Sequence, residues 1–282
     1  MLSKTLWTLW ALLPILGLTY HFGPGQDAYT RDRATRLLSQ AAAAQRAAEA
    51  SQEAAYARHL ETIRARRDHV ASASPENAAR VKAAVAAEDE AYKVAAEAWR
   101  GVADAFGRVQ AVMPTGVGAE RVRVARGRAM VRSGQIGTGV QDLQDMLDEM
   151  EDRGEGDAPI AREAREELAT GYYYGARLMR LAGKPAEEWR EVSGRARRNF
   201  RYLAETEKDQ SVAADFKNNL ELVLNLEQTG VEDLQAKPQP KKSPRGNGNG
   251  ILPGKGRRSP QPPRRGDARN GASGTGEIEG GW

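Results

Sequence analysis

Residues 28–72 read AYTRDRATRLLSQAAAAQRAAEASQEAAYARHLETIRARRDHVAS and contain neither Gly nor Pro. Ala, Arg, Glu and Gln dominate this stretch, and all four are strong helix formers. Small or apolar residues recur at alternating intervals of four and three, at Leu37, Ala41, Ala44, Ala48, Ser51 and Ala55. This spacing places them on one face of a helix and predicts a seam that a second helix can approach closely.

A second long helix is expected directly after the first. Ser74, Pro75 and Glu76 form a typical helix start, with a capping hydroxyl, a Pro at the first helical position and an acid near the positive end of the helix dipole. The helix should continue to about Met113, because the Pro- and Gly-containing stretch 114–118 interrupts it. Two long helices joined by a short turn fold back on each other, so we predict an antiparallel hairpin over residues 27–114.

Shorter helices are expected between residues 115 and 235. Gly, Pro or a polar break separates them, which predicts helices over 119–132, 137–152, 159–182, 185–207 and 211–227. No stretch alternates apolar and polar residues over a useful length. We therefore predict an all-α fold without strands.

This region resembles tetratricopeptide-like helical hairpins. In residues 123–146 the resemblance rests on the small residues Gly127 and Gly139, the turn residue Gly134 and the large apolar residue Leu143. In residues 172–204 it rests on a second set of residues: Tyr172, Ala176, Met179, Gly183, Ala196, Phe200 and Leu203. Glu188 departs from the pattern, because a small residue is expected at its position. The resemblance implies antiparallel helix pairs that stack side by side and bind other proteins.

The N-terminal residues 6–22, LWTLWALLPILGLTYHF, are almost entirely apolar. As a helix they would reach about 26 Å, slightly less than the roughly 30 Å of a bilayer core. We expect an uncleaved signal anchor and hinge over residues 1–26, with a cleaved signal peptide or a buried soluble helix as alternatives. The bulk of the chain would then lie on the periplasmic side of a bacterial inner membrane. Through this anchor, the Ala-rich hairpin and the stretches YYYGARLMRL at 172–181 and RNFRYLA at 198–204, the chain is also similar to uncharacterised membrane-anchored helical proteins of planctomycete-type bacteria. This resemblance implies no activity.

The charges of the chain are unevenly distributed. The whole chain carries 42 basic and 38 acidic residues, which gives a net charge of +4. Residues 236–282 hold ten of the basic and three of the acidic residues, so this tail carries +7 and the preceding 235 residues carry −3. Seven Pro and eleven Gly in the tail predict disorder. Its candidate polyanion-binding residues are Lys241, Lys242, Arg257, Arg258, Arg264 and Arg265.

Candidate catalytic and metal-binding residues are scarce. The chain has no Cys and three His, which excludes thiol chemistry and Cys-ligated metals. His59 and His69 are ten residues apart and do not share a helix face as metal ligands at i and i+4 would. Gly254-Lys255 lacks the remaining residues of a phosphate-binding loop. We therefore expect no enzyme activity, no cofactor and no metal.

One cluster, Tyr173 with Arg177 and Arg180, suggests a binding surface. The two arginines lie at i+4 and i+7 from the tyrosine and would share one side of a helix, which could offer an aromatic and basic groove to an acidic peptide. The alternative is that two of the tyrosines Tyr172–Tyr174 pack in the core while the arginines lie on the surface or pair with Glu163, Glu166 and Glu167.

These patterns together predict a membrane-anchored, non-enzymatic helical scaffold that binds proteins at the bacterial cell envelope. Its parts would be the anchor (1–26), the Ala-rich hairpin (27–114), the tetratricopeptide-like region (115–235) and the basic tail (236–282). A tether that binds nucleic acid or an anionic envelope polymer through the tail is the alternative function.

Overall fold

The structure is a computed structural model that describes residues 2–22, 24–113, 115–228 and 230. Within these ranges it is all-α and has no strand. Its helices are α1 (Leu2–Phe22), α2 (Pro24–Ala71), α3 (Pro75–Gln110), α4 (Val117–Arg132), α5 (Ile136–Asp152), α6 (Pro159–Leu181), α7 (Ala186–Thr206) and α8 (Gln210–Gln228). The predicted all-α class is confirmed, and the helices from α2 onward begin and end within a few residues of the predicted ranges.

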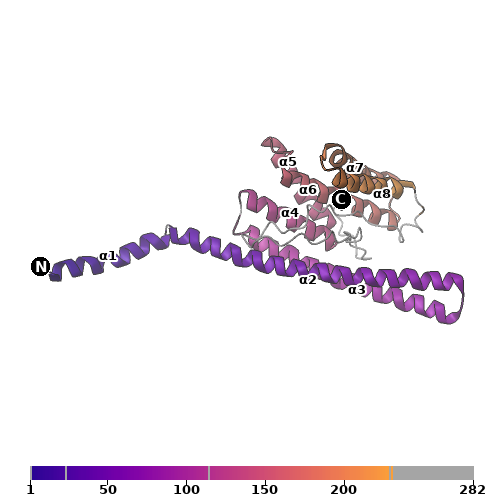
Figure 1. Ribbon diagram of the computed structural model, residues 1–282, viewed down its shortest axis with the longest axis horizontal. Coiled ribbons are helices and arrows are strands. Elements are labelled where there is room, and N and C mark those ends of the chain that lie inside the picture. The colour runs from indigo at the N-terminus through magenta and orange to yellow at the C-terminus, as the bar shows by residue number, and fades with distance from the viewer. Residues whose placement is uncertain (1, 23, 114, 229, 231–282) are drawn as a thin grey trace.

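The long helices α2 and α3 form an antiparallel hairpin (Figure 1). The predicted cap holds α3 at its start, because the Ser74 hydroxyl accepts a hydrogen bond of 3.1 Å from the backbone N–H of Asn77. The side chain of Asn77 in turn donates to the Ser72 carbonyl at 2.7 Å. These two bonds close the turn at the far end of the hairpin.

The seam between α2 and α3 differs in register from the prediction. Ala41, Ala48 and Ala55 are completely buried, as expected. Leu38 and Gln52 are also buried, at 7% and 1% exposure, whereas the predicted seam residues Leu37 and Ser51 are only partly buried. The buried positions 34, 38, 41, 48, 52 and 55 share three residues with the predicted seam, and positions 38 and 52 replace the predicted 37 and 51. Trp99, Phe106 and Val109 of α3 fill the opposite side.

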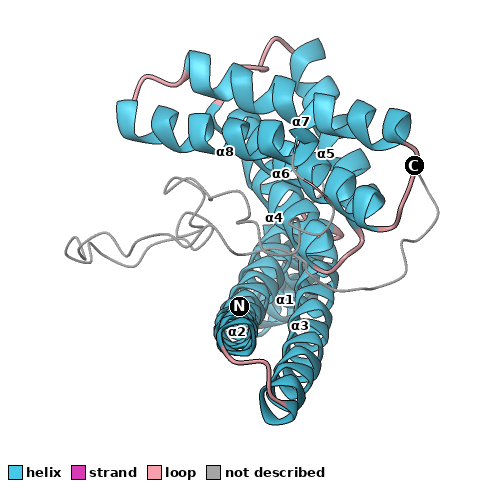
Figure 2. Cartoon of the chain, turned by 90° about the vertical axis from the view of Figure 1, so that its right-hand side faces the viewer, coloured by secondary structure: helices cyan, strands magenta, loops and turns pink. Residues whose placement is uncertain are grey.

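The helices α4 to α8 stack as successive antiparallel neighbours on one side of the hairpin. Figure 2 shows the hairpin at the bottom and α4, α6, α7 and α8 in layers above it. One core lies inside this bundle, and a second lies between α2, α3 and α4. The helix α4 contributes to both, with Val124 and Val131 in the first and Val122 and Ala129 in the second. It therefore joins the bundle to the hairpin.

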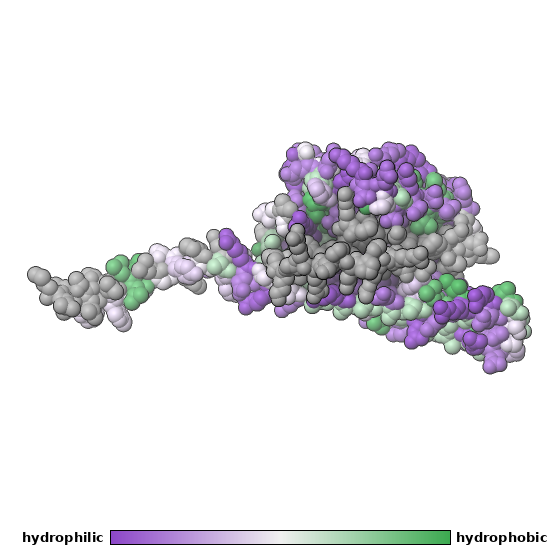
Figure 3. All heavy atoms as spheres, in the orientation of Figure 1, coloured by the Kyte–Doolittle hydropathy of each residue, from purple (hydrophilic) through white to green (hydrophobic). Residues whose placement is uncertain are grey.

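The helix α1 leaves its apolar side chains exposed. Trp7 is 74% exposed and Trp10 is 70% exposed, and Figure 3 shows hydrophobic residues on this arm but mostly hydrophilic residues on the bundle. In the part of the chain that the structure describes, no helix combines the length and the apolar character needed to cross a membrane. The structure therefore does not support the membrane-spanning helix predicted at residues 6–22. The predicted disordered tail, 236–282, lies outside the described residues.

Candidate functional site

A groove of 1230 Å³ lies at one end of the bundle. The beginnings of α4, α6 and α8 and the ends of α5 and α7 meet there, because successive helices run antiparallel. We call it the end groove. Met150, Ile160, Leu203 and Phe216 contribute its apolar floor, and all four are also part of the bundle core. The floor is thus fixed by core packing.

The rim of the end groove is strongly charged. Its basic residues are Arg121, Arg123, Arg153, Arg162 and Lys208. Its acidic residues are Glu120, Glu149, Glu155, Asp157, Glu163, Glu166 and Glu207. Seven acids against five bases leave the described lining with a small negative excess.

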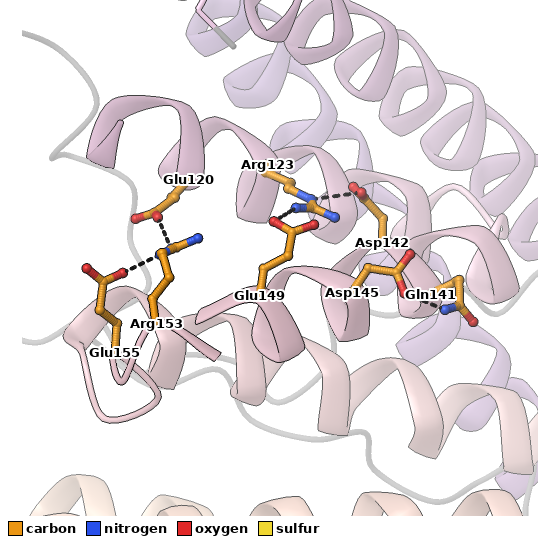
Figure 4. Close-up of polar contacts among 8 residues, drawn as sticks. All are labelled: Glu120, Arg123, Gln141, Asp142, Asp145, Glu149, Arg153 and Glu155. Atoms are coloured by element: carbon orange, nitrogen blue, oxygen red, sulfur yellow. Dashed lines mark hydrogen bonds and ion pairs between the residues drawn. The ribbon is translucent and has the colours of Figure 1, made fainter. Parts of the chain in front are cut away.

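Arg153 forms a clamp across the rim. Its Nη2 lies 2.6 Å from Glu120 Oε1, at the start of α4, and its Nε lies 2.9 Å from Glu155 Oε2, in the loop before α6. Figure 4 shows the guanidinium between the two carboxylates. The hydrogen bond with Glu155 raises the pKa of Arg153 above its ordinary value, so the clamp stays charged at any physiological pH.

Arg123 forms a second bridge, between α4 and α5. Its Nε lies 3.0 Å from Asp142 Oδ1, and its Nη1 lies 2.8 Å from Glu149 Oε2 (Figure 4). Burial acts to lower the pKa of Arg123, but the hydrogen bonds with Asp142 and Glu149 outweigh it, and the pKa is raised. The guanidinium is only 18% exposed, so this bridge fixes one wall of the groove rather than moving freely in solvent.

The opposite wall is held in the same way. Arg162 Nη1 donates to the Thr206 carbonyl at 3.3 Å, and its Nη2 lies 3.3 Å from Glu207 Oε2, which ties the start of α6 to the end of α7. Behind the rim, Arg128 Nη2 lies 2.7 Å from Glu163 Oε1. The groove therefore has a preformed shape, with most of its basic side chains already bound to carboxylates.

The candidate binding residues predicted on α6 do not form an exposed groove. Tyr173 is 1% exposed and Arg177 is 6% exposed, so both lie inside the bundle. Burial raises the pKa of Tyr173, as expected for a phenol without solvent contact. Arg180 stacks on the Trp189 ring at 4.7 Å and donates to the Leu226 carbonyl of α8. Tyr173 therefore packs in the core, as in the alternative interpretation. Arg177 is buried too, and Arg180 contacts α7 and α8, which neither interpretation predicted.

The described lining of the end groove consists mainly of charged and apolar residues. Among the described residues that line it there is no His, Cys, Ser or Tyr, and Thr115 is its one hydroxyl. No group of three or more potential metal ligands occurs in the described part of the chain. His59, far from the groove, hydrogen-bonds Glu88 across the hairpin at 2.7 Å. The described groove residues thus offer charge and apolar surface, without a nucleophile and base in contact.

Little in the sequence points to this site. Its one visible signal is the charge of α5, which holds six acidic residues and no basic one. The predicted polyanion-binding residues of the tail, from Lys241 to Arg265, lie outside the described residues. No family model matches the chain, and neither a curated protein nor a solved structure gives a significant match.

Proposed function

We propose that the protein is a non-enzymatic helical scaffold that binds a segment of a partner polypeptide in the end groove. The observation that carries this proposal is the combination of a 1230 Å³ groove, a buried apolar floor and a preformed charged rim. Small-molecule sites usually have volumes of about 300–1,000 Å³ and are mostly enclosed. An open groove above that range is better suited to a peptide segment, whose apolar side chains would contact the floor while its polar groups meet the rim.

The order of the helices adds support. Helices α4 to α8 are antiparallel neighbours in sequence order, and α4 also contacts α6. Tetratricopeptide-like proteins, which residues 123–146 and 172–204 resemble, stack their hairpins in this manner and use the resulting surface to hold other proteins. We propose the same arrangement and use for α4 to α8.

We further propose that α1 attaches the scaffold to a membrane at the bacterial cell envelope. Large apolar side chains are exposed on every side of this helix, at Trp7, Trp10, Leu12, Leu13, Ile15, Leu18 and Tyr20. A helix that is apolar all round is stable only when it is covered, and a lipid surface covers it without a specific partner. Residues 2–22 contain no acidic residue that would oppose insertion among lipid headgroups.

The test of the scaffold function is a pull-down of the tagged full chain from detergent-solubilised membranes. Ala158→Trp places a large ring in the end groove, and Ala79→Trp places the same ring on the exposed surface of α3 as the matched control. We expect the partner captured by the unaltered chain to be lost with Ala158→Trp and kept with Ala79→Trp, as identified by mass spectrometry. Capture of the same proteins by all three would contradict the proposal. Circular dichroism spectra of the three proteins should coincide.

The alternative function, a tether for nucleic acid or an anionic polymer, rests on the +7 charge of residues 236–282. Binding through exposed Lys and Arg weakens steeply with salt, because counterions are released from the polyanion. Deletion of residues 236–282 decides between the two functions. Partner capture that survives the deletion and is insensitive to salt supports the scaffold, whereas loss of a salt-sensitive partner supports the tether.

A further inference from the structure

The acidic residues of the folded part are concentrated around the end groove. The groove lining and α5 together contain twelve acidic and five basic residues. Residues 1–235 contain 35 acidic and 32 basic residues in all, which leaves 23 acidic and 27 basic residues elsewhere. The negative charge of the body thus belongs to one region, the groove and the helix beside it.

Three of these acidic residues, all on α5, are exposed and have no basic partner among the described residues. Asp145, Asp148 and Asp152 follow each other at helical spacing along the exposed side of α5. Gln141 and Gln144 donate hydrogen bonds of 2.7 Å to Asp145 and Asp148, but an amide neutralises no charge. Figure 4 shows Asp145 on the same wall as Asp142 and Glu149, so the acidic surface continues from the rim of the groove along α5.

The chain itself contains a segment of the opposite charge. Residues 237–269, which we call the basic tail segment, carry ten basic residues and one acidic residue, a net charge of +9. They follow α8, whose residue Phe216 lies in the floor of the groove. Phe216 is twelve positions before the end of α8 at Gln228, a separation of about 18 Å along the helix.

The chain between α8 and the basic tail segment is long enough for the segment to reach the end groove. The first basic residue of the segment, Lys237, is seven residues beyond the last described residue, Gly230. An extended chain spans about 3.3 Å per residue, so seven residues cover about 23 Å. Because the segment is tethered, its effective concentration at the groove is in the millimolar range, and a weak interaction is sufficient for occupancy.

We propose that the end groove binds the basic tail segment of the same chain. The Lys and Arg side chains pair with the exposed carboxylates of α5 beside the rim, and the intervening backbone lies over the apolar floor. The tail therefore competes with a partner polypeptide for the groove. This inference rests on the proposed function of the end groove. It implies that a partner binds more readily when the basic tail segment is outside the groove.

The test is site-specific photo-crosslinking in the full chain. A benzophenone amino acid replaces Lys208, at the rim of the groove, or Lys82, an exposed lysine of α3 that serves as the matched control. We expect crosslinks from position 208 to peptides of residues 237–269, at least fivefold above those from position 82. The yield should fall several-fold between 50 mM and 500 mM NaCl, because salt screens exposed charges. Mixing of isotope-labelled and unlabelled chains identifies crosslinks within one chain.

A second pair of variants tests the role of the acidic surface. Asp145→Asn, Asp148→Asn and Asp152→Asn together should reduce the crosslink yield at position 208 several-fold. The matched triple variant Glu53→Gln, Asp89→Asn and Glu97→Gln removes the same charge from exposed hairpin positions and should leave the yield unchanged.

Equal yields at positions 208 and 82, or crosslinks that are mainly between chains, would overturn the inference. So would equal effects of the two triple variants. The assay contains no partner protein, so its failure leaves the scaffold function intact, and failure of the pull-down leaves the tail contact intact.

Discussion

Leu143 of α5 packs directly over Gly127 of α4. A Cβ atom at Gly127 would lie 2.7 Å from Leu143 Cγ, a distance that side chains do not tolerate. One turn earlier on α5, a Cβ atom at Gly139 would lie 2.9 Å from the Gly127 carbonyl oxygen and 3.0 Å from Met130 Cβ. The two glycines therefore allow α4 and α5 to approach closely, and this contact brings Arg123 within reach of Asp142 at the rim of the end groove.

Gly139→Ala should destabilise the protein. The added methyl group meets backbone and Cβ atoms that cannot rotate away, so we expect a loss of about 1–3 kcal/mol in the free energy of unfolding. Gly101→Ala on α3 is the control, because a Cβ atom there meets nothing within 4 Å. That substitution should stabilise α3 by up to about 1 kcal/mol. Urea unfolding followed by circular dichroism measures both, and equal stabilities would refute the close approach of α4 and α5.

Arg128→Ala should be among the most destabilising single substitutions. Arg128 Nε lies 2.5 Å from Glu167 Oε1, and both side chains are buried, at 3% and 6% exposure. Removal of the guanidinium leaves a buried carboxylate without its cation, which costs about 3–5 kcal/mol. Arg36→Ala breaks an exposed pair with Asp32, so a loss below about 1 kcal/mol is expected. Chemical denaturation measures the free energy of unfolding of both variants. Similar losses for Arg128→Ala and Arg36→Ala would show that the buried ion pair contributes no more than the exposed one.

The hairpin should lose stability in acid through Glu88. Burial acts to raise the pKa of Glu88, but hydrogen bonds from His59 and Thr62 outweigh it and lower the pKa below 4.5. A carboxyl whose folded pKa is lowered stabilises the fold above its unfolded pKa, and this contribution disappears as the pH falls through the folded pKa. Glu88→Gln should therefore lower Tm at pH 7, and its Tm should approach that of the unaltered protein as the pH falls through the folded pKa of Glu88.

Melting curves between pH 3 and pH 7 measure this difference. Asp89→Asn, an exposed neighbour on α3, is the matched control and should follow the unaltered protein at each pH. A difference between Glu88→Gln and the unaltered protein that does not change with pH would argue against the predicted linkage.

The attachment of α1 to a membrane predicts loss of vesicle binding when its tryptophans are removed. Burial of a large apolar side chain contributes about 1.5–3 kcal/mol, and 1.4 kcal/mol corresponds to a factor of ten. Trp7→Ser with Trp10→Ser should thus lower the partition coefficient about a hundredfold or more in flotation with phosphatidylcholine and phosphatidylglycerol vesicles. Val70→Ser removes an 86% exposed apolar side chain from the hairpin and should float like the unaltered protein. If the variant with Trp7→Ser and Trp10→Ser also floats like the unaltered protein, α1 does not bind the membrane.

Local sequence signals are sufficient to place the helices from α2 onward. Pro75 at the start of α3, Gly134 between α4 and α5, and Pro159 at the start of α6 mark boundaries that the structure confirms. Gly134 and Gly183 have φ angles of 92° and 71°, which a residue with a side chain rarely adopts. Capping, helix propensity and turn geometry depend on a few neighbouring residues, so the sequence determines them locally.

Tertiary packing, in contrast, sets which helix faces are buried and which distant residues come into contact. On α2, Leu37 and Leu38 are equally apolar, and their contact with α3 alone decides that Leu38 lies in the seam. On α6, Tyr173 and Arg177 share a side in either interpretation, but the packing of the bundle buries both of them. The pair formed by Arg153 and Glu120 joins residues 33 positions apart, and the pair formed by Arg162 and Glu207 joins residues 45 positions apart. No local sequence pattern predicts such ion pairs, because only the folding of the chain brings these distant residues together around the groove.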